Sequence, residues 1–302
     1  MKMIMAGLGR MGSNMARRLQ RGGIEVVGYN RTLRVTEELA QECGLIPAST
    51  LSAAVQQLVP PRVIWLMLPA GESTEQTIHE LPALLTPGDV VVDGGNTWYK
   101  DSERRGQWLA EHGLGFVDAG TSGGIWGLEN GYCLMVGGLA QDVALVEPIL
   151  KILAPTPDQG WAHVGPIGAG HFVKMVHNGI EYGMMQALAE GFSLLRGKTN
   201  FAIDTAQVAE LWRHSSVVRS WLLDLSATVL ADNPNLTDVA PRVADSGEGR
   251  WTILESVEQG VATPVLALAL QMRFASRDTE GYGNRLLAMM RNAFGGHGVQ
   301  SN

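Results

Sequence analysis

The 302-residue sequence predicts an α/β protein: an N-terminal Rossmann-type domain, with a doubly wound and mostly parallel sheet, followed by an all-α helical domain. Two observations indicate this fold. Short apolar strand patterns alternate with helical stretches in the first half, and a glycine-rich turn directly follows the first strand. Strand patterns then stop, so we expect two domains, over residues 1–165 and 166–302.

The elements follow in order along the chain. The first strand is expected at residues 1–6, and the helix after it ends at Arg21 because Gly22-Gly23 follows. Further strands are predicted at residues 24–29, 63–68, 89–93, 115–119 and 132–136, with some antiparallel pairing in the last part of the sheet. Helices are predicted at residues 168–195, 204–214, 217–230, 251–259, 265–277 and 281–292.

The turn after the first strand has the pattern G-x-G-x-x-G in a strand–turn–helix setting. In this setting Gly7 permits the tight turn, Gly9 lets the backbone approach a pyrophosphate, and Gly12 allows close packing of helix on strand. The start of the helix offers free N–H groups to phosphates. We therefore expect a dinucleotide to bind at Gly7, Leu8, Gly9, Arg10, Met11 and Gly12.

The end of the second strand indicates which dinucleotide binds. Enzymes that use NAD usually carry an acidic residue there for the ribose 2′-hydroxyl. This sequence has Asn30-Arg31-Thr32, and a neutral side chain followed by arginine suits a 2′-phosphate. We expect NADP to bind at these residues, and NAD remains the alternative if Arg31 is only a solvated loop residue.

Three more loops follow strand ends, where ligands of doubly wound sheets bind. Two of them contain glycine pairs beside a polar side chain, which is typical of a close backbone approach to a ligand. The loops are Leu68-Pro69-Ala70-Gly71, Gly94-Gly95-Asn96 and Ser122-Gly123-Gly124.

A polar stripe on the predicted helix 168–195 is the most informative feature of the second half. Helical spacing places a lysine, a histidine, an asparagine, a glutamate and a tyrosine on one side of an otherwise apolar helix. A base and an acid on one buried face suit proton transfer, although a solvated face or a satisfied buried network would show the same pattern. The residues are Lys174, His177, Asn178, Glu181 and Tyr182.

Composition excludes several classes of function. The formal net charge is −7 and charged residues make up 18% of the chain, which argues against a nucleic-acid or membrane-surface partner. Cys43 and Cys133 are the only cysteines, so we expect a reducing cytoplasm and no disulfide framework. No metal-ligand cluster occurs in the sequence, and no apolar run reaches the length of a membrane span.

Several segments together resemble the 6-phosphogluconate dehydrogenase family, in its short bacterial form within the β-hydroxyacid dehydrogenase superfamily. The narrow signals are HFVKMVHNGIEY at residues 171–182 and the terminal RNAFGGH at 291–297. The glycine motif, YNRT, DGGN, SGG and SGEGRWT also fit the family pattern. The resemblance covers nearly the whole chain.

The resemblance implies the activity and the residues that carry it out. It implies NADP-dependent, or NAD-dependent, oxidative decarboxylation of 6-phosphogluconate to ribulose 5-phosphate and CO₂ without a metal. Lys174 would be the general base and Glu181 the general acid, and Leu68, Pro69, Ala70 and Asn96 would join the cofactor site. His177 and Asn178 would also belong to the catalytic residues. The groups that would bind substrate are Asn96, Ser122, Gly123, Gly124, His177, Asn178, Tyr182, Arg273, Arg291 and His297.

The resemblance also implies a homodimer or homotetramer, in which the C-terminal tail with Arg291 and His297 completes the site of the partner subunit. Residues 166–302 would then bind substrate and form the dimer. One departure concerns the phosphate: long members have a lysine where this chain has Ser246, and Arg250 is a candidate to replace it. The resemblance leaves open whether the enzyme serves the pentose phosphate pathway or gluconate utilization.

Two other functions compete with this one. A related β-hydroxyacid dehydrogenase acting on a small non-phosphorylated 3-hydroxy acid would share the glycine motif, SGG and the lysine helix. It would leave Arg273 and Arg291 without a phosphate to bind. A non-catalytic NADP-binding sensor is the third possibility, and it would leave Lys174 and Glu181 without a task.

Overall fold

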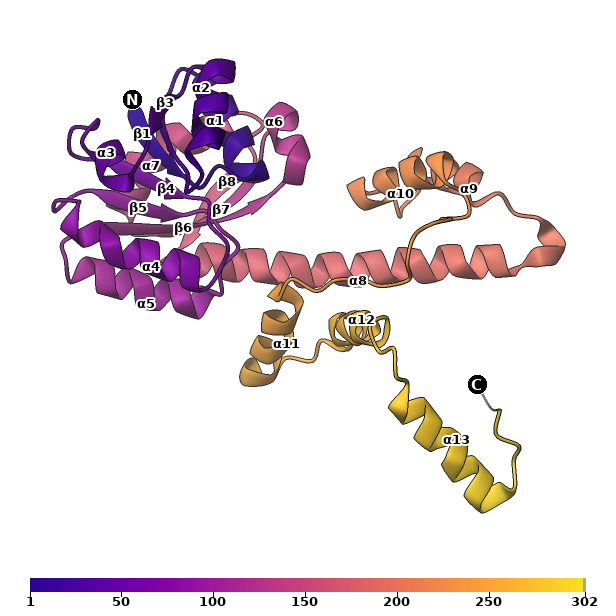
Figure 1. Ribbon diagram of the computed structural model, residues 1–302. Helices are drawn as coiled ribbons and strands as arrows, with labels where there is room; N and C mark the ends of the chain where they lie inside the picture. Colours follow the sequence, from indigo (N-terminus) through magenta and orange to yellow (C-terminus); the bar gives the residue numbers. More distant parts are fainter. Residues whose placement is uncertain (301–302) are drawn as a thin grey trace. The chain divides into compact units, whose positions relative to one another are not determined.

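The computed structural model describes residues 1–300, and its first half contains one eight-stranded sheet (Figure 1). The strands are β1 (Lys2–Ala6), β2 (Glu25–Tyr29), β3 (Ile46–Ala48), β4 (Val63–Leu66), β5 (Val90–Asp93), β6 (Gly115–Ser122), β7 (Cys133–Gly138) and β8 (Trp161–Gly165). Their order is β3-β2-β1-β4-β5-β6-β7-β8, and every pairing is parallel except the antiparallel pair β6–β7. The predicted fold class is confirmed.

Helices cover both faces of this sheet. They are α1 (Arg10–Arg21), α2 (Leu33–Cys43), α3 (Leu51–Val55), α4 (Glu72–Glu80), α5 (Tyr99–Ala110), α6 (Gly127–Asn130) and α7 (Ala140–Leu153). Successive residues of β1 point to opposite faces: Met3 and Met5 pack in one core with α1, α2 and α7, and Ile4 and Ala6 pack in the other with α3, α4 and α5. The sheet is thus buried on both sides, as its uninterrupted apolar strands require.

The chain forms two compact units, Met1–Asn178 and Gly179–Asn302, and the long helix α8 (Ala169–Gly197) runs from the first into the second. The second unit is helical. Its other helices are α9 (Thr205–Arg213), α10 (Trp221–Asp232), α11 (Glu248–Gln259), α12 (Pro264–Ala275) and α13 (Tyr282–Gly295). The predicted helix 217–230 begins later, at Trp221, because the Ser220 side chain accepts a hydrogen bond from the Leu223 N–H and caps it there.

The second unit buries little apolar surface by itself. Its buried clusters are small, one around Tyr182, Ala269 and Leu270 and the other around Ala209, Ala227 and Leu230. None of the residues of α13, all of which the structure describes, is buried. Across residues 1–300, no helix combines the length and the apolar character needed to cross a membrane.

Candidate active site

The glycine motif forms the turn between β1 and α1. Gly7 has φ +95°, and a Cβ there would lie 2.4 Å from the Met67 carbonyl oxygen. A Cβ on Gly12 would lie 2.0 Å from the Gly7 oxygen, so both positions require glycine. A Cβ on Gly9 would meet nothing within 4 Å, which leaves open space above the first turn of α1. The residues therefore fit a dinucleotide, with Gly9 exposed where a pyrophosphate would approach.

Asn30 holds this loop from the end of β2. Its Oδ1 accepts a hydrogen bond of 3.1 Å from the Leu8 N–H, and its Nδ2 donates to the Thr32 carbonyl at 3.3 Å. Arg31 is exposed, and its guanidinium forms no hydrogen bond or ion pair with any residue from 1 to 300. Asn30 thus supports the turn, whereas Arg31 is available to an anionic ligand.

Two of the predicted ligand loops lie against each other. A Cβ on Gly95 would come within 2.7 Å of the Leu68 carbonyl oxygen, so the loop after β5 touches the segment after β4. Pro69 and Ala70 are exposed beside Leu68, and Asn96 is exposed beside Gly95. The contact gathers candidate cofactor and substrate groups at the carboxyl edge of the parallel strands.

Lys174 lies on α8 in the first unit and is only 5% exposed. Its Nζ is 3.5 Å from His177 Nδ1, and His177 Nε2 is 3.3 Å from the Ser122 hydroxyl at the end of β6. Asn178, also buried, lies with its Oδ1 3.0 Å from His177 Nδ1. The structure therefore brings together an amine, an imidazole, an amide and a hydroxyl, a set that can transfer a proton and bind hydroxyls.

Strand β6 fixes the start of α8. The fully buried Asp118 accepts hydrogen bonds of 2.7 Å from the N–H groups of Gly168, directly before the helix, and of His171, in its first turn. A carboxylate at this end also interacts favourably with the helix dipole. One strand thus carries Ser122 at its end and anchors the helix that carries Lys174.

A separate cluster forms within the second unit around Tyr182, which is 6% exposed. The Arg273 guanidinium lies 3.6 Å from the centre of the tyrosine ring, and the tyrosine hydroxyl lies 3.3 Å from Ser246 Oγ. The Ser246 hydroxyl donates to the buried carboxylate of Glu248. Tyr182 and Arg273, two of the residues expected to bind the substrate phosphate, are therefore neighbours. Ser246, which stands where long family members have a lysine, lies beside Tyr182.

The remaining phosphate candidates lie elsewhere. Arg250, the candidate to replace the family lysine, donates from Nε to Asp245 Oδ2 at 2.6 Å and lies over the Phe274 ring. Its guanidinium is therefore already paired with a carboxylate. Burial, the largest single influence, opposes ionisation of Asp245, yet the hydrogen bonds from Arg250 and the Gly247 N–H and the charges of Arg250 and Arg277 together prevail and lower its pKa. Arg291 is exposed on α13, and His297 is exposed in the tail beyond it.

Family models match both halves of the chain. The model described as the NAD binding domain of 6-phosphogluconate dehydrogenase matches residues 2–165, and that of the C-terminal domain of 6-phosphogluconate dehydrogenase matches residues 170–288. The chain belongs to the 6-phosphogluconate dehydrogenase family.

Individual relatives agree with this membership. The chain is 39% identical over 300 residues to the NAD(+)-dependent, decarboxylating 6-phosphogluconate dehydrogenase of Haloferax volcanii, covering 99% of this chain and 98% of the relative. It is 38% identical to the decarboxylating enzyme of Synechococcus elongatus, covering 89% of this chain but 60% of that longer protein.

The fold is also that of a solved family member. A 6-phosphogluconate dehydrogenase of Plasmodium falciparum, solved in its apo form, with NADP+ and with 6-phosphogluconate, superposes with a TM-score of 0.86 at 28% identity. The match covers 100% of this chain and 66% of the Plasmodium protein. The chain thus spans about two thirds of the length of the Plasmodium protein.

Sequence reasoning missed the buried ionic groups that support these loops. Asp93 ends β5 and Asp118 lies within β6, where a carboxylate in an apolar strand is itself a signal that a buried partner exists. Arg105, 1% exposed on α5, is the cation that pairs with Asp93. Which cation pairs with which strand depends on helix packing, so the pairing could not be predicted from spacing.

Proposed function

We propose that this chain catalyses the oxidative decarboxylation of 6-phospho-D-gluconate to D-ribulose 5-phosphate and CO₂, with NADP as the preferred cofactor and NAD as an alternative. The observation that carries the proposal is the buried Lys174 beside His177 and Ser122, at the carboxyl edge of a dinucleotide-binding sheet. Membership in the 6-phosphogluconate dehydrogenase family supports the choice of reaction.

In this proposal Lys174 is the general base. It takes the proton of the substrate's 3-hydroxyl, and the nicotinamide of the bound cofactor supplies the acceptor for the hydride that leaves C3. The resulting 3-keto acid loses its carboxylate as CO₂, and protonated Lys174 stabilises the enediol oxygen. Glu181, seven residues further along the same helix, then protonates C1 to give the product.

The chain's other residues bind and orient the substrate. Ser122, Gly123 and Gly124 offer a hydroxyl and backbone groups at the end of β6, and Gly123 and Gly124 both have positive φ, which permits the sharp turn there. His177 and Asn178 supply donors and acceptors to the hydroxyls, as does Asn96. Tyr182 and Arg273 bind the phosphate, for which a guanidinium is well suited.

We further propose that residues 166–302 form the substrate and dimerisation domain, with residues 1–165 binding the cofactor. Support for dimerisation comes from α13, which leaves large apolar side chains exposed at Leu286, Leu287, Met289, Met290 and Phe294. A helix with an exposed apolar face is typical of one that packs on another chain. The partner would receive Arg291 and His297 in its phosphate site, as a homodimer or homotetramer.

One observation favours a second candidate. Where long family members carry a lysine, this chain has the neutral hydroxyl of Ser246, which donates to the buried carboxylate of Glu248. A small non-phosphorylated 3-hydroxy acid would not need that cation. This substrate class is therefore the alternative that the first experiment must distinguish.

The experiment is turnover of 6-phosphogluconate with NADP or NAD, followed by the absorbance of the reduced nicotinamide and by release of CO₂. Reduction coupled to CO₂ release supports the proposal. If the cofactor is reduced only with a non-phosphorylated 3-hydroxy acid, the second candidate function is supported instead. Lys174→Met is expected to abolish turnover while NADP binding persists, because the glycine loop is untouched; retained turnover would refute Lys174 as the base.

A further inference from the structure

Loops 68–71 and 94–97 follow β4 and β5 at the carboxyl edge of the sheet. A buried aspartate at the end of β5 holds the second of these loops. Asp93, the last residue of β5, is fully buried. Its Oδ1 accepts from the Gly95 N–H at 3.1 Å, and its Oδ2 accepts from the Thr97 hydroxyl at 3.0 Å. Both oxygens therefore hold the loop that presents Asn96, and Gly95 of that loop touches Leu68 of the other.

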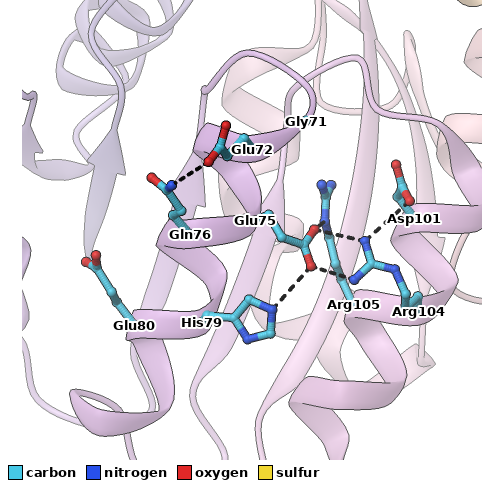
Figure 2. A pocket seen from close by; sticks show the side chains of 9 residues that line it. All are labelled: Gly71, Glu72, Glu75, Gln76, His79, Glu80, Asp101, Arg104 and Arg105. Carbon is cyan, nitrogen blue, oxygen red and sulfur yellow. Dashed lines mark hydrogen bonds and ion pairs between the residues drawn. The ribbon is translucent and has the colours of Figure 1, made fainter.

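Arg105 on α5 connects this acid with the other loop. Its Nη1 donates to Asp93 Oδ2 at 3.1 Å. Its Nε donates to Glu75 Oε2 at 2.9 Å, a bond drawn in Figure 2. Glu75 lies in the first turn of α4, where the Thr74 hydroxyl donates to the Pro69 carbonyl at 2.8 Å. The Arg105 guanidinium thus connects the end of β5, which precedes loop 94–97, with the start of α4, which follows loop 68–71.

The charges of this network are balanced and largely removed from water. Asp93 is completely buried and Arg105 is 1% exposed, so both charges are removed from bulk solvent. Arg104 also pairs with Glu75, at the exposed side of the network, and Figure 2 shows both arginines directed at the same carboxylate. A charge buried in this way is stable only while its partner keeps its place, which makes the geometry rigid.

We propose that Arg105 is a positioning residue, whose bridge between Asp93 and Glu75 holds loops 68–71 and 94–97 in the arrangement that the reaction requires. The consequence for turnover rests on the function proposed above. Arg105 touches neither reactant in this proposal; it acts through Asn96 and through Leu68, Pro69 and Ala70. Lysine cannot replace it, because a point charge does not present two separated donors to two carboxylates.

The test compares Arg105→Lys with Arg104→Lys. Both keep the charge on the same helix, but only Arg105 reaches Asp93, so Arg104→Lys is the matched control. We expect Arg105→Lys to lower kcat by about 10- to 100-fold, because misplaced binding groups slow a reaction by this order. The dissociation constant of NADP should rise by a smaller factor than kcat falls, since Arg105 bonds to Asp93, Thr97 and Glu75 and not to the glycine loop. Arg104→Lys should retain kcat within about twofold.

A second readout does not depend on turnover. NADPH bound to wild type and to each variant is compared by its fluorescence enhancement, which reports the surroundings of the nicotinamide. A smaller enhancement for Arg105→Lys alone, in protein shown by circular dichroism to be folded, supports the proposal even if 6-phosphogluconate is not the substrate. Unchanged kcat and unchanged fluorescence in folded Arg105→Lys would overturn it.

A purely structural role would give a different pattern. It would lower the melting temperature and the folded fraction while each folded molecule kept its kcat, and that result also overturns the proposal. If Arg105→Lys does not fold, Glu75→Gln decides, because it breaks the bridge at its half-exposed end and leaves the Arg105–Asp93 pair intact. Folded Glu75→Gln is then expected to have a lower kcat than wild type, and an unchanged kcat would overturn the proposal.

Discussion

Gly120 of β6 lies directly beneath Lys174 of α8: a Cβ on Gly120 would come within 2.4 Å of the lysine Cβ and 2.8 Å of the Gly170 oxygen. Nothing larger than glycine fits at this crossing of strand and helix. Because Gly120 has no side chain, α8 can pack close to β6 at Lys174. Any larger residue at position 120 must push α8 away from the strand.

Gly120→Ala tests this relationship. Overpacking of this kind costs about 1–3 kcal/mol of unfolding free energy, and a shift of Lys174 by about 1 Å should lower kcat by about 100-fold. Urea denaturation and steady-state kinetics measure the two effects. Gly191→Ala is the control, on the helix that carries Lys174: a Cβ there meets nothing within 4 Å, so stability should rise slightly and kcat should not change.

Arg31 is expected to select the cofactor. In Arg31→Ala the loss of a charge-assisted contact to the 2′-phosphate should raise the KM for NADP by about 10- to 100-fold and leave the KM for NAD nearly unchanged. Arg34→Ala removes an equally exposed cation that pairs with Glu38 instead, and it should alter neither value. Equal effects of Arg31→Ala on both cofactors would show that Arg31 does not read the 2′-phosphate.

Acid should weaken the network around Glu75. Hydrogen bonding to Arg104 and Arg105 prevails over burial and lowers the pKa of Glu75 from 4.5 to about 2. Because the folded state has the lower pKa, the carboxylate stabilises the fold above pH 4.5, and this stabilisation is lost as the pH falls from there toward about 2. Urea midpoints across this range should fall less steeply for Glu75→Gln than for wild type. Glu72→Gln, which removes a carboxylate bonded to Gln76, should follow wild type.

Tyr132 carries a buried hydroxyl that has no hydrogen-bond partner within residues 1–300. Burial raises the pKa of this tyrosine to about 12, because the anion cannot be solvated there. Tyr132→Phe removes the unsatisfied group and keeps the ring, so the unfolding free energy should rise by about 1 kcal/mol. Tyr182→Phe, which deletes a hydroxyl bonded to Ser246, should lower it; the reverse order would contradict the assignment.

The strands that the sequence pattern revealed are the six inner ones of the sheet. Both missed strands, β3 and β8, lie at its edges. β3 has three residues and contains Pro47, and β8 exposes His163, so neither shows the apolar run of a strand buried on both faces. An edge strand forms because it pairs with one neighbouring strand, and its own residues do not show which strand that is.

The candidate site divides in the same way. The glycine loop and the lysine stripe follow from local spacing, because a turn and a helix face are each made by neighbouring residues. The support of Leu8 by Asn30 and the bridge from Asp93 to Glu75 through Arg105 join separate elements. Spacing cannot predict such contacts, since they exist only when the helices pack on the sheet.

Asp118 makes the beginning of α8 dependent on the sheet. The N–H groups of Gly168, directly before the helix, and of His171, in its first turn, bond to a side chain in the middle of β6, so these two amides have their partner only where the helix start packs on that strand. These two amides should consequently exchange with deuterium as slowly as the strands themselves, although amides at helix starts usually exchange fast. The start of the helix that carries the proposed base is thus held by the sheet, and its stability depends on that of β6.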